Sequence, residues 1–86
     1  MIGRLCNVYK SAKSTNLYLY VARDEGLQRV PEALLEKFGE PELALTIDLH
    51  PTRRLAREDP VKVIAAIDQN GFYLQLPPQP YIPKPL

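Results

Sequence analysis

The chain has 86 residues, enough for one domain with its own core and too few for two. Its 11 basic and 10 acidic residues leave a net charge of +1. This charge is too small to attract nucleic acid or membranes through the electrostatic field of the whole protein. A single cysteine excludes an internal disulfide and a four-cysteine zinc site, and no apolar run approaches the roughly 18 residues of a membrane span. We therefore expect a cytoplasmic protein with no bound cofactor, no metal site and no membrane contact.

The first half of the chain predicts a hairpin, a helix and a strand. Residues 4–10 and 17–22 alternate apolar and polar side chains across a polar loop, which is typical of a β-hairpin. Pro31 is expected at the first helical position, and Gly39 is expected to end that helix. Residues 42–49 then alternate cleanly and predict a third strand.

The second half predicts one more helix and one more strand. Leu55 is expected to anchor its segment to the core. Asp59 followed by Pro60 is a strong helix start, and Gly71 is suited to the left-handed conformation that ends a helix. Residues 72–76 alternate as a fourth strand, and prolines then stop sheet pairing. We expect a single domain over residues 1–76 and a proline-rich C-terminal tail over 77–86.

The predicted order is ββαβαβ: a compact α+β domain with a four-stranded sheet and flanking helices. The alternation within each strand predicts two unlike sheet faces. The first face is apolar and is expected to point inward; the second is rich in tyrosine. The expected apolar face holds Cys6, Val8, Leu17, Leu19, Val21, Leu43, Leu45, Ile47, Phe72, Leu74 and Leu76, and the second holds Asn7, Tyr9, Tyr18, Tyr20, Thr46, Tyr73 and Gln75.

Several stretches resemble the YcgL-domain family of small bacterial proteins. They are Tyr18-Leu19-Tyr20-Val21, Arg29-Val30-Pro31-Glu32 with Leu35, Phe38-Gly39 and Pro41, and Gly71-Phe72-Tyr73-Leu74-Gln75-Leu76-Pro77-Pro78. The resemblance runs from about Cys6 to Pro78. It implies a compact α/β arrangement with helices flanking a sheet, and it implies no catalytic or binding residues.

Catalytic candidates are few. His50 lies two residues from Asp48, and such a pair can orient a general base, although Pro51 favours a solvated turn instead. Cys6 sits at an inward-pointing strand position, where a free cysteine usually packs as a small hydrophobe, even with Arg4 nearby to activate a thiol. No phosphate loop and no paired carboxylates stand out. We therefore expect no enzyme and no catalytic residue.

A candidate interaction surface combines aromatic and basic side chains. Its residues are Tyr18, Tyr20, Tyr73, Arg53, Arg54 and Arg57. Tyrosines beside positive charge can stack single-stranded RNA, whereas a covering helix would leave only their hydroxyls near water. The sequence favours a non-catalytic protein-interaction module with an unidentified protein partner. A single-stranded RNA-binding domain that uses the tyrosine face is the alternative, which the near-neutral charge does not favour.

Overall fold

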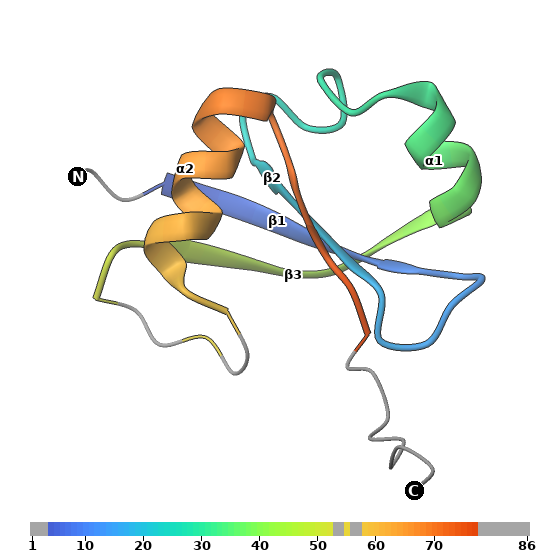
Figure 1. Cartoon of the computed structure of the whole chain (residues 1–86), viewed down its shortest axis with the longest axis horizontal. Helices are drawn as coiled ribbons and strands as arrows, with labels where there is room; N and C mark the ends of the chain where they lie inside the picture. Colours follow the sequence, from blue (N-terminus) through green and yellow to red (C-terminus); the bar gives the residue numbers. More distant parts are fainter. Residues whose placement is uncertain (1–3, 53–54, 56–57, 78–86) are drawn as a thin grey trace, which may run out of the picture.

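The computed structural model describes residues 4–52, 55 and 58–77, and six elements lie within them. All strand pairs are antiparallel, and the sheet order is β3-β1-β2-β4. Figure 1 shows α1 and α2 at opposite ends of the view, with the strands running between them. The predicted α+β class and the ββαβαβ order are confirmed. The elements are β1 (Arg4–Ser11), β2 (Tyr18–Ala22), α1 (Glu32–Phe38), β3 (Pro41–Leu49), α2 (Pro60–Asn70) and β4 (Tyr73–Gln75).

Both ends of α2 follow from the side chains found there. The Asp59 carboxylate accepts a hydrogen bond from the Val61 backbone N–H at 2.9 Å, and Pro60 occupies the first helical position. Gly71 takes a φ of 90°, and its N–H donates to the Ile67 carbonyl at 2.9 Å. These predictions are confirmed. In α1 the prediction was one residue early: Pro31 is the N-cap, with φ −59° and ψ 140°.

α2 covers one face of the sheet, and this face carries Tyr18, Tyr20 and Tyr73. The register pairs Cys6 with Ala22 and Val8 with Tyr20, and directly opposed residues share a face. The prediction that Cys6 and Val8 share a face with the leucines of β2 was therefore wrong, because the hairpin loop sets the register and the alternation within a strand does not. Leu55 packs against this cluster, as predicted. The buried residues of this first cluster are Cys6, Val8, Tyr20, Ala22, Leu49, Val63, Ile64 and Ile67.

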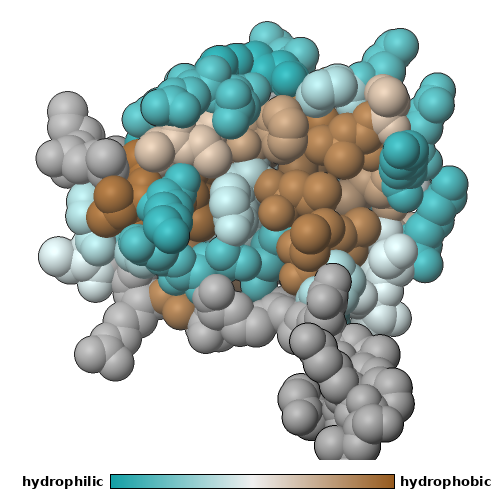
Figure 2. All heavy atoms as spheres, in the orientation of Figure 1, coloured by the Kyte–Doolittle hydropathy of each residue, from teal (hydrophilic) through white to brown (hydrophobic). Residues whose placement is uncertain are grey.

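The opposite face packs against α1 and the segment before it. Leu19 and Val21 of β2 meet Val30 and Phe38 there in a second buried cluster. Tyr9 also packs on this face, so the prediction that it joins the other tyrosines was wrong. Several apolar side chains around this cluster stay half-buried, because α1 is only seven residues long. Figure 2 shows apolar surface between α1 and β4, two elements that carry some of these side chains.

β3 is an edge strand, and most of it faces solvent. Its pairing with β1 shifts between Val8 and Tyr9, so that Val8 opposes Leu45 and Tyr9 opposes Leu43. Ala44 is the extra residue of a β-bulge, which puts Leu43 and Leu45 on opposite faces. Leu43 is 57% exposed and Leu45 is 48% exposed. The prediction that both point inward on one apolar face was wrong.

Two further features complete the fold. Leu76, also expected inward, is exposed because β4 ends one residue earlier, at Gln75. Over the residues that the structure covers, no helix is long and apolar enough to cross a membrane.

Candidate interaction surfaces

Tyr20 is part of the core. Its side chain is 8% exposed, and its hydroxyl donates a hydrogen bond to the Oε1 atom of buried Gln75 at 2.9 Å. Its ring lies edge-to-face with that of Tyr73, with centroids 6.0 Å apart and an interplanar angle of 75°. The ring faces of Tyr20 are therefore in use within the protein and are not available to stack a base.

The two neighbouring tyrosines are half-buried beside Tyr20. The Tyr73 hydroxyl donates to the Glu58 carboxylate, and this hydrogen bond, together with burial, raises the pKa of Tyr73 to about 12. Tyr18 packs against the same cluster and pairs with Gln75. The structure thus brings Tyr18, Tyr20 and Tyr73 together on the face that α2 covers, with Tyr20 in the core and the other two half-buried against it.

The predicted basic half of this surface consists of Arg53, Arg54 and Arg57. These three residues lie outside the described residues. The structure therefore describes only the tyrosine half of the predicted surface.

The two catalytic candidates are held by ordinary structural contacts. Cys6 is fully buried, and burial raises the pKa of its thiol to about 11, although the Arg4 charge acts in the opposite direction. His50 directly follows β3, and its Nδ1 atom is 2.9 Å from the hydroxyl of Thr52. The packing role predicted for Cys6 is confirmed.

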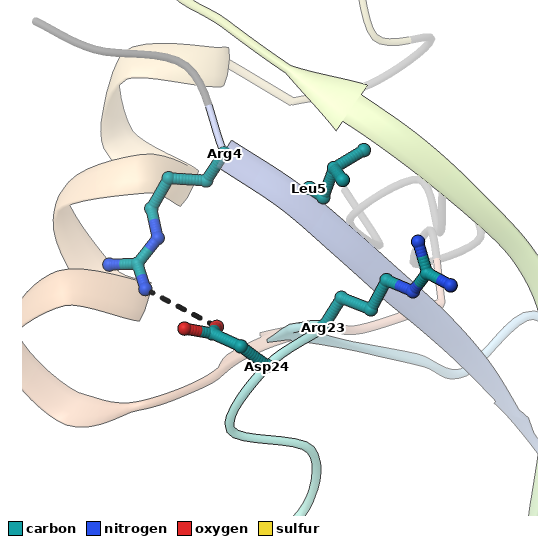
Figure 3. A pocket seen from close by; sticks show the side chains of 4 residues that line it. All are labelled: Arg4, Leu5, Arg23 and Asp24. Carbon is teal, nitrogen blue, oxygen red and sulfur yellow. Dashed lines mark ion pairs between the residues drawn. The ribbon is translucent and has the colours of Figure 1, made fainter.

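Arg4 joins the start of β1 to α2 and to the turn after β2. Its guanidinium pairs with Asp68, which raises the pKa of Arg4, and lies 3.8 Å from both Asp24 and Glu25. Figure 3 shows the hollow beside it, with Leu5 and Arg23 on the other side of β1 from the Arg4 guanidinium. Three carboxylates already surround Arg4, so the Arg4 guanidinium has little charge left for an anionic ligand, and Arg23 is the second basic side chain that lines this hollow.

The strongest candidate surface is one that the sequence analysis missed, and we name it the β3 edge. It consists of the exposed residues Glu42, Leu43, Leu45, Thr46 and Asp48. A signal for it was present, since an opening proline and charged residues near both ends of a strand are typical of sheet edges. The clean apolar alternation of residues 43–49 hid this signal, because it is also the pattern of a strand with one buried face.

A shallow hollow adjoins the start of the β3 edge. Leu27, Leu35 and Pro41 provide apolar surface in it, and Pro41 is also the first residue of β3. Carboxylates dominate its charged lining, and one lysine lies among them. These charged residues are Glu32, Glu36, Glu40 and Lys13.

Comparison with known proteins places this chain among small bacterial proteins. The YcgL domain family model matches residues 6–78. A YcgL domain-containing protein of Pseudomonas putida strain W619 is 52% identical over 75 residues, which cover 87% of this chain and 77% of the relative. A relative in Pseudomonas aeruginosa strain PAO1 has the same identity and the same coverage. A third relative, from Stutzerimonas stutzeri strain A1501, is 50% identical over 74 residues, covering 86% of this chain and 76% of its own length.

Proposed function

The chain belongs to the YcgL-domain family, and we propose that it is a non-catalytic domain that binds another protein through the β3 edge. The observation that carries this proposal is the exposure of Leu43 and Leu45 on a nine-residue edge strand. Exposed leucines on a long strand edge invite pairing with another chain, and soluble proteins normally shield such edges. A protein partner that covers the β3 edge would bury both side chains.

We also propose that the protein catalyses no reaction through Cys6 or His50. Cys6 is buried with its thiol pKa raised, so little thiolate exists near neutral pH. His50 is in contact with Thr52, a residue of the same turn. Neither candidate has the arrangement of an activated nucleophile or a positioned base.

Binding of single-stranded RNA is the less favoured function. Stacking needs open aromatic faces, and Tyr20 is buried under α2. A net charge of +1 also leaves the counterion-release contribution small.

Site-specific photo-crosslinking tests the proposal. A photoreactive amino acid would replace Leu45 in chain expressed in Pseudomonas putida, with the same replacement at Val61 as the control, since Val61 is 41% exposed on α2. We expect a discrete adduct at position 45 that protease removes, and no such adduct at position 61. An adduct at position 45 that ribonuclease removes, or equal labelling at both positions, would contradict the proposal.

A further inference from the structure

The outer side of β3 is open to backbone pairing. Among the described strands, β1 is its only neighbour, and residues 42–46 are all exposed. The side of a strand that faces away from its neighbour presents N–H and C=O groups, with which an extended peptide can pair as an added strand. Pro41 stands at the first position of β3, so the residues after it keep their backbone N–H groups.

The bulge gives the β3 edge an apolar side chain on each face of the sheet. Leu45 opposes Val8 on the face covered by α2, and Leu43 opposes Tyr9 on the other face. An added strand would therefore have one exposed leucine beside it on each face of the sheet. A segment with apolar residues at alternate positions could cover Leu45, and its neighbouring side chains would lie beside Leu43.

The charge around the β3 edge is mainly acidic. Lys10 lies 3.7 Å from the Glu42 carboxylate, and Lys13 donates to the backbone carbonyl of Glu36 at 3.1 Å. Lys37 of α1 is the third lysine near this surface, and among the described residues five carboxylates outnumber these three lysines. The carboxylates are Glu42 and Asp48 on β3 and Glu32, Glu36 and Glu40 around the adjoining hollow.

This charge disfavours a second copy of the chain as the occupant. In an antiparallel pair of two β3 strands centred on Leu45, Glu42 of one copy would oppose Asp48 of the other. A pair centred on Ala44 sets Leu43 against Leu45, but it also sets Glu40 against Asp48. These are the two registers that place Leu45 opposite an exposed leucine of β3, since Leu49 is buried. Like charges directly opposed across strands are destabilising.

We infer that the β3 edge accepts an extended segment of a partner protein in which apolar residues alternate with Lys or Arg. The backbone of this segment adds to β3 as a fifth strand. Its apolar side chains cover Leu45 on one face, and its cations lie beside Leu43 on the other face, near the surrounding carboxylates. The inference rests on the proposed protein-binding function and adds the conformation and chemistry of the partner.

Peptide titrations followed by fluorescence anisotropy test this inference. The probe is a labelled peptide of sequence Lys-Val-Lys-Ile-Arg-Val-Lys, and its matched control carries Glu at every basic position. The protein variants are Leu45→Lys, Leu43→Lys and, as the control for added charge, Val61→Lys on α2. All three positions are exposed, so each variant is expected to fold, which circular dichroism checks.

Near 0.15 M salt we expect the basic peptide to bind at least about tenfold more tightly than the acidic one. Leu45→Lys and Leu43→Lys should each weaken binding at least about tenfold, and Val61→Lys by less than about twofold. Equal binding of the two peptides, or equal weakening by all three substitutions, would overturn the inference. So would a concentration-dependent dimer that Leu45→Lys abolishes, since a second copy would then occupy the edge.

The two proposals can fail separately. A protein adduct at position 45 without binding of the basic peptide would refute the partner chemistry and leave the protein-binding function standing. Absence of any adduct at position 45 would count against the function itself.

Discussion

At the scale of single residues, two hydrogen bonds from hydroxyl groups connect Tyr20 and Tyr73 to the rest of the fold. Tyr20 donates to buried Gln75, and Tyr73 donates to Glu58. The residue types of the strands predicted that these tyrosines share a face, but not that the face would be covered. The covering depends on where α2 docks, which alternation within a strand does not determine.

Replacing Tyr20 with Phe should destabilise the protein by about 1–3 kcal/mol, because the Oε1 atom of Gln75 would remain buried without its donor. Tyr18→Phe is the matched control. Among the described residues no hydrogen bond to the Tyr18 hydroxyl is found, so its loss should cost less than about 0.5 kcal/mol. Urea denaturation of both variants provides the comparison, and equal stabilities would show that the Tyr20–Gln75 hydrogen bond contributes little.

Because the Cys6 thiol is buried, we expect the protein to lose stability at alkaline pH. The pKa of Cys6 is raised from an ordinary value of 9.0 to about 11, so the fold favours the neutral thiol. This contribution is fully present below pH 9 and is lost as pH rises through 11. Urea denaturation from pH 8 to pH 11 should show a steeper decline for the wild type than for Cys6→Ala. Parallel curves would mean that the thiol ionises as readily in the folded chain as in the unfolded one.

At the scale of elements, the sequence predicted every helix and strand but not their registers. β3 is the clearest case, because Leu43, Leu45, Ile47 and Leu49 alternate along it as though all faced one core. Position in the sheet and the Ala44 bulge decide their burial instead, and Leu49 alone among them is fully buried. Both features depend on which strand pairs with β3. The pattern of residues within β3 does not determine that pairing.

Truncation of Leu19 in β2 and of Leu45 in β3 should therefore have very different effects on stability. Leu19→Ala should cost about 2–5 kcal/mol, because Leu19 is fully buried in the second cluster. Leu45→Ala should cost less than about 1 kcal/mol, because half of that side chain is already exposed. Chemical denaturation measures both. A cost above about 2 kcal/mol for Leu45→Ala would show that β3 is covered within the free chain.

The conformation of the turn between α2 and β4 should require glycine at position 71. Its φ of 90° disfavours any other residue, and a Cβ atom placed there would collide with the Cβ of Arg29. Gly26 also has a positive φ, 59°, but a Cβ there meets open space. Gly71→Ala should therefore lower the free energy of unfolding by more than Gly26→Ala, whose cost should be about 1 kcal/mol. Equal costs in thermal or urea melts would contradict the close approach of Arg29.

At the scale of the whole molecule, one sheet separates two small clusters. α2 covers one face, and α1 with the segment before it covers the other. β2 contributes buried side chains to both clusters, whereas Leu49 is the one buried residue of β3. The chain therefore leaves one long strand edge exposed, with one leucine on each face of the sheet and a group of carboxylates around it. The proposed function follows from that arrangement and not from any chemically reactive side chain.

The most direct test of this account is backbone hydrogen exchange, resolved by NMR, in the free chain and with saturating basic peptide. Strand addition should slow exchange at least about tenfold for β3 amides that point away from β1, because those groups gain hydrogen-bond partners. Amides of α1, α2 and β4 should exchange as in the free chain. Unchanged exchange along β3, or new protection confined to another element, would contradict the claim that the β3 edge is the docking surface.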